Sequence, residues 1–325
     1  MMNSGKYSLS IVIPTYNRSN QIERTIRSIN QALLPDGFAV EVIVVDNNSE
    51  PSHGDRYREL VASQHGQVKF RYVREERQGR SNACNKGLNE AQAEWVGFID
   101  DDEALDSRWI QRAAYWMIRS GVDYIGGACV PDWETNPPKW LPAHSGQYRG
   151  ILGWIDLRSE VTSYDDFDGE LCGGNFIAKT KLLLDVGGFN TKLGRSVGNL
   201  LGGEDGDLHR RIKAASAVGF YDPDFVILHA IPASRMTVSY HLKWAYWSGV
   251  ANGIRIENGE GPREDVPHLL GVPRYWFKKA SVGFFEFLRE VLLFRWLSSP
   301  DGIVGLMDCC YLWGLYRKSG ALAAR

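Results

Sequence analysis

Short apolar runs that each end in polar residues recur through the first two-thirds of the chain. Leu9–Pro14, Glu41–Asp46 and Trp95–Ile99 are the clearest, and each predicts a buried strand. Apolar residues at helical spacing follow the first of them from about Ser19. Strands that alternate with helices over short links indicate an α/β sheet, and ligands of such sheets bind outside the carboxyl ends of the strands.

The same reasoning predicts further strands at Val68–Val73, Tyr124–Val130, Leu171–Ala178 and Phe225–His229, and further helices near Asp55–Gln64, Ala83–Ala91, Asp106–Ser120 and Lys181–Val186. Between Pro131 and Asp168, four prolines interrupt any regular element. A long irregular segment inside a domain is often a binding loop. Its tryptophans offer flat apolar faces on which a sugar ring can stack: Trp133, Trp140 and Trp154.

Three consecutive carboxylates, Asp100, Asp101 and Asp102, follow a buried strand. Burial at the end of a strand disfavours the charged form of each acid. A divalent cation removes that penalty, and carboxylates are suitable ligands for Mg²⁺ or Mn²⁺. The alternative is an ordinary polar turn before the next helix, for which Asp106 is a good N-cap residue.

A second acidic pair stands at Gly202-Gly203-Glu204-Asp205, where a helix is predicted to begin. Two glycines before adjacent acids suit a mobile loop that presents a carboxylate. The alternative is that the acids only complement the helix dipole, which would also stabilise the Asp205 anion and lower its basicity. His229 ends the last predicted strand and is either a structural residue or a ligand.

Composition narrows the class of protein. The 325 residues are enough for one large domain or for one domain with an appendage. They are 44% apolar with a net charge of −2, which argues against nucleic acid as a partner. Five cysteines without metal-binding spacing fit a reducing compartment. The N-terminal sequence does not resemble a signal peptide, and apolar runs are too short to span a bilayer, so a cytoplasmic location is expected.

The C-terminal part, from about Arg235, is predicted to be helical. Two segments, Ser281–Leu297 and Gly302–Tyr316, are largely apolar and have basic residues beside them. They can lie at a membrane interface. They can equally form an ordinary hairpin that packs on the catalytic domain or in a homodimer.

Taken in order, these motifs resemble those of the family 2 glycosyltransferases with the GT-A fold. The resemblance covers about residues 8–255 and rests on Ser10–Arg18, Val44–Ser49, Asp100–Asp102, Gly173–Asn175, Gly187–Phe189 and Gly203–Asp205. It implies a Rossmann-like mixed sheet flanked by helices, with a C-terminal helical extension. The implied domains are a catalytic domain at 1–235, with a nucleotide-sugar half at 1–105 and an acceptor half at 106–235, and a helical region at 236–325.

The resemblance also assigns roles. Many relatives carry a second aspartate where Asn47 stands, so the base of the nucleotide stays open. The implied nucleotide-sugar site consists of Pro14, Tyr16, Asp46, Asn47, Arg80, Asp100 and Asp101. Asp102 would hold Mn²⁺ or Mg²⁺, and His229 matches a position where some GT-A enzymes add a ligand. Asp205 matches the general base of the inverting enzymes, with Glu204 beside it. Acceptor contacts are expected from Trp133, Trp140, Trp154, Gly174 and Asn175.

The implied reaction is metal-assisted, inverting transfer of a sugar from a nucleotide-diphosphate sugar to a hydroxyl of a glycan or lipid-linked acceptor, as in polysaccharide biosynthesis. A Gln-x-x-Arg-Trp motif is absent, so the enzyme is expected to be non-processive. The protein would be cytoplasmic or peripheral at the inner face of the membrane, and a homodimer stays open. One alternative is a nucleotidyltransferase, although Pro14–Ser19 is not a glycine-rich phosphate loop. The other is a non-catalytic carbohydrate- or membrane-binding subunit, which the two intact acidic motifs disfavour.

Overall fold

The computed structural model describes residues 7–141, 149–259, 266–293 and 299–323. The chain forms two compact units, and each is built from separate segments. The first consists of Met1–Asp132, Gly153–Val197 and Glu204–Ala230, and the second of Trp133–Leu152, Gly198–Gly203 and Ile231–Arg325. The predicted division into domains at residue 235 stays a prediction.

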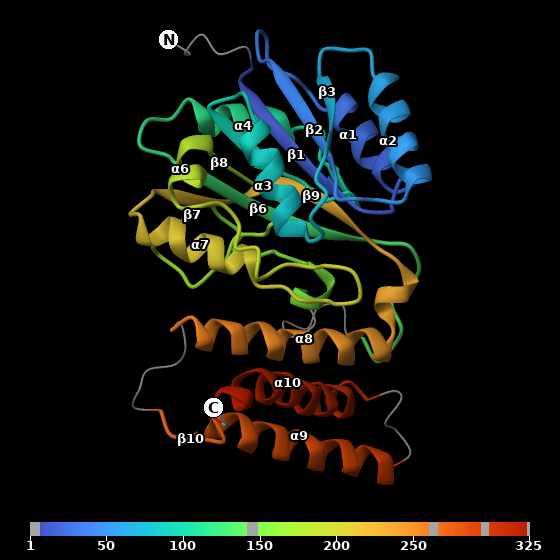
Figure 1. Cartoon of the computed structure of the whole chain (residues 1–325), viewed down its shortest axis with the longest axis vertical. Coiled ribbons are helices and arrows are strands. Elements are labelled where there is room, and N and C mark those ends of the chain that lie inside the picture. Colours follow the sequence, from blue (N-terminus) through green and yellow to red (C-terminus); the bar gives the residue numbers. More distant parts are fainter. Residues whose placement is uncertain (1–6, 142–148, 260–265, 294–298, 324–325) are drawn as a thin grey trace. The chain divides into compact units, whose positions relative to one another are not determined.

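A nine-stranded sheet runs through the first unit (Figure 1) in the order β3-β2-β1-β4-β8-β6-β9-β5, with β7 beside β9. The strands are β1 (Leu9–Thr15), β2 (Val40–Asp46), β3 (Lys69–Arg74), β4 (Trp95–Phe98), β5 (Glu103–Leu105), β6 (Tyr124–Trp133), β7 (Thr162–Ser163), β8 (Phe176–Lys179) and β9 (Gly219–Ile231). Strands β1 to β4 are parallel to their neighbours in this group, whereas β8 is antiparallel to both β4 and β6. The predicted mixed α/β sheet is confirmed.

Helices cover both faces of the sheet, because alternate side chains of a strand point to opposite sides. In β1, Ile11 belongs to one buried cluster together with Trp109, whereas Val12 belongs to the other together with Leu88. The first cluster takes in α1 (Ile22–Gln31), α2 (Pro51–Ala62) and α4 (Trp109–Met117). The second takes in α3 (Arg80–Glu90), α6 (Thr180–Asp185) and α7 (Glu204–Ala214).

Parallel register brings the carboxyl ends of the first strands to one edge. Thr15 at the end of β1 lies opposite Asp46 at the end of β2, and Asp46 lies opposite Arg74 at the end of β3. The acidic loop after β4 begins at the same level, since Phe98 lies opposite Val12. The polar turns predicted after these strands therefore meet at the edge where α/β sheets bind ligands.

Two strands differ from the prediction for local reasons. Strand β5 was not predicted, because three residues are too few for a periodic signal; it pairs with β9. Strand β9 is longer than the predicted Phe225–His229, since a charged residue hides its start. That residue, Asp222, is fully buried and accepts hydrogen bonds from Arg112 and from Trp116 Nε1. Because Asp222 is paired, it can be buried inside β9, so the strand starts earlier than the sequence pattern predicted.

The second unit is mainly helical, as predicted for the C-terminal part, and also contains a short antiparallel pair of strands, β10 (His268–Leu269) and β11 (Val272–Pro273). Figure 1 shows α10 (Pro300–Ala323) lying between α8 (Val238–Glu257) and α9 (Arg274–Leu292). The helices approach at glycines: a Cβ on Gly249 of α8 would lie 2.0 Å from the Tyr311 carbonyl oxygen, and one on Gly305 would lie 2.0 Å from the Gly283 carbonyl oxygen. In the described part of the chain, no helix is both long and apolar enough to cross a membrane.

Candidate active site

Arg80, the first residue of α3, joins the two acidic motifs of the sequence. Its guanidinium lies 2.8 Å from Asp100 Oδ1, 3.3 Å from Glu204 Oε1 and 3.2 Å from Asp205 Oδ1. It also donates a hydrogen bond of 3.0 Å to the carbonyl oxygen of Gly173. The side chain is only 13% exposed. One buried cation therefore holds acids that lie about a hundred residues apart in the sequence.

The two acids at the start of α7 differ in their access to solvent. The Glu204 side chain is 6% exposed, whereas that of Asp205 is 32% exposed. Asp205 lies directly on the backbone of Gly173, where a Cβ would come within 2.0 Å of its Oδ1. Of the pair, Asp205 is the carboxylate that a substrate can reach.

The pKa of Asp205 is raised to about 7. Burial is the largest cause, the neighbouring Glu204 carboxylate adds to it, and the Arg80 guanidinium acts in the opposite direction. The N-terminus of α7 was expected to lower the basicity of Asp205, and that expectation is wrong in sign. Partial removal from water and a second acid at the next position outweigh the helix dipole.

Arg18 supplies a second cation beside the acidic loop. Its Nη1 lies 2.9 Å from Asp101 Oδ1 and 3.0 Å from Asp102 Oδ2. Thr15 Oγ1 donates a further hydrogen bond of 2.8 Å to Asp101. Burial raises the pKa of Asp101 to about 6, and Arg18 opposes that shift. The repulsion among three adjacent acids is therefore offset in part by Arg18, and Asp101 makes its contacts inside the protein.

Asp102 and His229 face each other across the pairing of β5 with β9, with Asp102 Oδ1 3.6 Å from His229 Nε2. A Cβ on Gly153 would lie 2.7 Å from His229 Nδ1, so the backbone there packs against the imidazole. Two ligands of one ion, each roughly 2.1 Å from it, lie roughly 3 Å or more apart. A carboxylate oxygen and an imidazole nitrogen at this separation fit a divalent metal such as Mn²⁺.

Asp46 lies at the predicted nucleotide edge but is fully buried. It accepts hydrogen bonds of 2.7 Å from the Tyr72 hydroxyl and 2.8 Å from the Ser49 amide, and Arg74 Nη1 lies 3.0 Å from it. These contacts fix the loop that follows β2. Contact of Asp46 with the base or ribose stays a prediction.

Asn47 shapes the loop in front of α3. Its Oδ1 accepts a hydrogen bond of 2.8 Å from the Gly79 amide, and its Nδ2 donates one of 2.7 Å to the Arg77 carbonyl oxygen. Pro14 is buried and Tyr16 is half-buried at the same edge. The predicted nucleotide residues are thus neighbours along one edge, and their individual roles stay predictions.

Two of the predicted acceptor residues have structural roles here. Asn175 is completely buried; its Oδ1 accepts a hydrogen bond of 2.7 Å from Trp109 Nε1, and its Nδ2 donates to the carbonyl oxygens of Ala128 and Phe225. The side chain joins strands and is not accessible to an acceptor. Gly174 lies against the Glu103 carboxyl group, where a Cβ would come within 2.2 Å of an oxygen.

The three tryptophans divide between the units. Trp140 is 9% exposed in the core of the second unit, with its ring centroid 5.1 Å from that of His241, so it is a core residue and not a stacking platform. Trp133 packs half-buried against the same core. Trp154 belongs to the first unit, is half-buried, and follows Gly153, which packs on His229. Residues 142–148 of the predicted acceptor segment lie outside the described residues.

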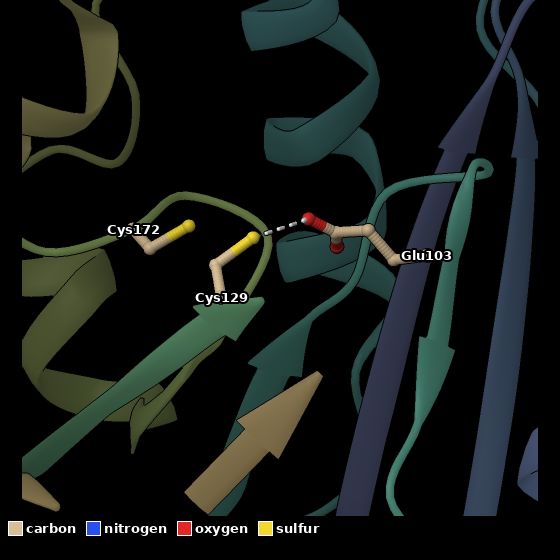
Figure 2. Close-up of side chains that lie close together, drawn as sticks. All are labelled: Glu103, Cys129 and Cys172. Carbon is tan, nitrogen blue, oxygen red and sulfur yellow. Dashed lines mark hydrogen bonds between the residues drawn. The ribbon is translucent and has the colours of Figure 1, made fainter. Parts of the chain in front are cut away.

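Glu103 stabilises the acidic loop through a hydrogen bond to its backbone, a role that was not predicted from the sequence. Its Oε2 accepts a hydrogen bond of 2.7 Å from the Asp100 amide, and its Oε1 lies 4.0 Å from Cys129 Sγ. Figure 2 shows the Glu103 carboxyl group and the Cys129 and Cys172 thiols pointing toward one another, with ligand atoms within 4.8 Å. Burial raises the pKa of Glu103, and the pKa of Cys129 is raised by Cys172 and by burial. Both shifts favour the protonated forms of Glu103 and Cys129, and the hydrogen bond from the Asp100 amide to Glu103 fixes the start of the acidic loop.

A model of the family described as "Glycosyl transferase family 2" matches residues 10–168. The "Succinoglycan biosynthesis protein ExoM" of Rhizobium meliloti (strain 1021) is 25% identical over 259 residues, which is 79% of this chain and 78% of that protein. The "GalNAc(5)-diNAcBac-PP-undecaprenol beta-1,3-glucosyltransferase" of Campylobacter jejuni is 28% identical over 182 residues, which is 56% of this chain and 54% of that protein.

Among solved structures, the mannosyltransferase PcManGT from Pyrobaculum calidifontis, in complex with GDP-Man and Mn²⁺, superimposes with a TM-score of 0.56. The match covers 98% of this chain and 75% of that one at 20% sequence identity, and it shows the GT-A fold. The ordered motifs, the fold and the related sequences agree: the chain is a glycosyltransferase, and its residues 10–168 match the family 2 domain.

Proposed function

We propose that this enzyme moves a sugar from a nucleotide-diphosphate sugar to a hydroxyl of a glycan or lipid-linked acceptor, with inversion at the anomeric carbon. Asp205 is the general base, and Asp102 and His229 hold a divalent metal. The observation that carries the proposal is the partly exposed Asp205 carboxylate, with a pKa near 7, in the same Arg80-centred cluster as Asp100.

On the donor side, Asp100 shares the Arg80 guanidinium with the proposed base, Asp205. Arg80 and the Glu103 carboxyl group hold Asp100 from two directions, so its remaining oxygen has a fixed position for a ribose hydroxyl. Pro14, Tyr16, Asp46 and Asn47 would line the nucleotide. When bound, the divalent ion neutralises charge on the departing diphosphate.

On the acceptor side, Asp205 takes the proton of the attacking hydroxyl as the new bond forms. A base works best when its pKa lies near the working pH, and burial together with Glu204 brings Asp205 to that range. Attack opposite the departing diphosphate inverts the anomeric carbon. Glu204, buried against Arg80, positions the base.

The activities named for the related proteins support the substrate classes. One relative takes part in succinoglycan biosynthesis, and another transfers glucose to an undecaprenol-linked glycan. The structural neighbour was solved with GDP-Man and Mn²⁺. For this chain we propose a glycan or lipid-linked acceptor within polysaccharide biosynthesis, and Mn²⁺ or Mg²⁺ as the metal.

A thermal-shift panel of nucleoside diphosphates, each with and without Mn²⁺ or Mg²⁺, tests the donor half of the proposal. We expect one diphosphate to raise the melting temperature, and to do so mainly with metal; the matching monophosphate, which lacks the second phosphate, is the control. The corresponding nucleotide sugar should then be hydrolysed slowly. Proton NMR of the transferred sugar in the presence of acceptor reports whether the anomeric configuration inverts. The proposal fails if every diphosphate leaves the melting temperature unchanged.

A further inference from the structure

Helix α9 of the second unit has two opposite stripes of residues, each at spacings of three and four. The inner stripe, buried or half-buried, consists of Trp276, Ala280, Gly283, Phe287 and Glu290. The outer stripe, exposed at every position, consists of Lys278, Ser281, Phe285, Leu288 and Leu292.

The inner stripe fixes α9 to α10. The rings of Trp276 and Tyr311 lie 4.2 Å apart between centroids, and Gly283 meets Gly305 backbone to backbone. At the edge of this interface, Lys279 Nζ lies 3.0 Å from an Asp308 carboxylate oxygen. The helix is therefore anchored without using its outer face.

That outer face is unusually apolar. Seven of the eighteen large apolar side chains exposed among the described residues lie on α9 or at its C-cap, and Phe285 and Leu292 are 69% and 78% exposed. Val282 and Phe284, at 51% and 45%, widen the apolar arc on both sides of the outer stripe. An arc this wide is typical of a helix that lies in a membrane interface, whereas a coiled-coil seam is a narrow stripe.

Positive charge accompanies the apolar arc. Arg274 and Lys278 are exposed on the first two turns, and neither forms an ion pair with any residue that the structure describes. Lys278 lies in the same stripe as Phe285 and Leu292. Cationic side chains beside apolar ones attract anionic lipid headgroups. The same charges would repel one another if this face met a second copy of the chain.

We propose that the outer face of α9 docks in the plane of an anionic lipid surface. Phe285, Leu288 and Leu292 enter the boundary between headgroups and acyl chains, and Lys278 and Arg274 pair with lipid phosphates. The surface goes beyond the transferase function and does not depend on it, because it involves neither acidic motif nor donor.

Flotation of the full chain with vesicles tests the proposal. We expect the wild-type protein to float with vesicles of phosphatidylglycerol and phosphatidylethanolamine, and to remain below with phosphatidylcholine alone. Phe285→Glu combined with Leu292→Glu should lower the bound fraction about tenfold or more, because two apolar anchors become anionic. Lys278→Gln combined with Arg274→Gln should weaken binding and remove its dependence on salt.

The matched control is Ile118→Glu with Leu184→Glu, which places the same charges on exposed apolar residues of the first unit. This control should float like wild type, and thermal melts check that all variants are folded. Light scattering after size exclusion measures the molecular mass. The proposal is overturned if wild type ignores anionic vesicles, if the control loses as much binding as the α9 variant, or if the α9 variant only converts a dimer to a monomer.

Discussion

Arg80 Nη1 lies 3.2 Å from Asp205 Oδ1, so a buried cation rests against the acid proposed as the base. The contact opposes the effects of burial and of Glu204 on the pKa of Asp205, and the balance leaves that pKa at about 7. Arg80 therefore extends to lower pH the range in which the proposed base can accept a proton, in addition to holding the acidic motifs together.

The first prediction concerns this balance. The ratio kcat/KM should rise with pH and level off above about 7, because only the ionised Asp205 accepts a proton. Arg80→Gln removes a group that lowers the pKa of Asp205, so the rise in kcat/KM of this variant should move to higher pH. Glu204→Gln removes a group that raises the pKa of Asp205, so the rise in kcat/KM of this variant should move to lower pH. Identical profiles for all three proteins would contradict the assignment.

Asp205→Asn keeps the shape of the side chain but cannot take a proton. We expect kcat to fall by roughly 10²–10⁴-fold, the usual contribution of a general base, with donor binding little changed. Because the folded pKa of Asp205 is raised, its ionisation costs stability as pH rises through about 7. The melting temperature of the variant relative to that of wild type should therefore rise between about pH 4 and about pH 7. Near-normal turnover of Asp205→Asn, with loss in Glu204→Gln, would move the base to Glu204.

Asp102→Ala should abolish the metal-dependent part of nucleoside-diphosphate binding measured by calorimetry, since it removes one of two residues that fit the ion. His229→Gln should weaken that part without abolishing it. Asp106→Asn is the control, because this half-exposed acid forms an ion pair only with Arg108 among the residues that the structure describes, and an amide oxygen can still accept the 2.9 Å hydrogen bond from the Arg108 amide. Unchanged Mn²⁺ dependence in Asp102→Ala would remove Asp102 from the metal site.

Gly173→Ala tests the close approach of Asp205 to the backbone. The added methyl group would lie 2.0 Å from Asp205 Oδ1, so the carboxylate must move. We expect kcat to fall while the donor KM changes little, because displacement of a catalytic group acts on the chemical step. Gly66→Ala is the control, since nothing lies within 4 Å of its added methyl group. Equal activity of the two variants would show that Asp205 can work from another position.

The tryptophans are predicted to separate into two kinds. Trp154→Ala should raise the acceptor KM more than the donor KM, because Trp154 is half-buried and follows Gly153, whose backbone packs on His229. Trp140→Ala should lower the free energy of unfolding by about 3–5 kcal/mol, as expected for loss of a buried tryptophan. Urea denaturation and steady-state kinetics distinguish the two effects. A larger effect of Trp140→Ala on acceptor KM than on stability would reverse the interpretation.

Most strands of the first unit were predictable, because apolar runs such as Val42–Val45 are buried on both faces of the sheet. The order of the motifs along the chain was enough to indicate the fold. The predicted strand bounds that were wrong depend on which residues are buried in the folded protein. Asp222 sits inside β9 although aspartate normally ends a strand, since Arg112 and Trp116 pair with it.

The site was harder to predict, because nothing in the sequence connects Arg80 with residues 204 and 205. The sequence does not distinguish a buried glutamate such as Glu103 from a solvated one, so its hydrogen bond to the Asp100 amide could not be predicted. The sequence of an irregular segment does not show whether a tryptophan in it faces a ligand or the core. The pKa of Asp205 was misjudged in direction, because desolvation depends on the folded surroundings and not on position in a helix.

Cys129, which is 1% exposed, adjoins the Glu103 carboxyl group and the Cys172 thiol, and the next residue after Cys172 is the glycine on which Asp205 rests. A thiol reagent can reach Cys129 only when this part of the protein opens briefly. The labelling rate of Cys129 in the native enzyme thus measures how often this part of the protein opens locally. Slower labelling with donor present would show that donor binding makes local opening around Cys129 less frequent. The wild-type protein is enough for this measurement.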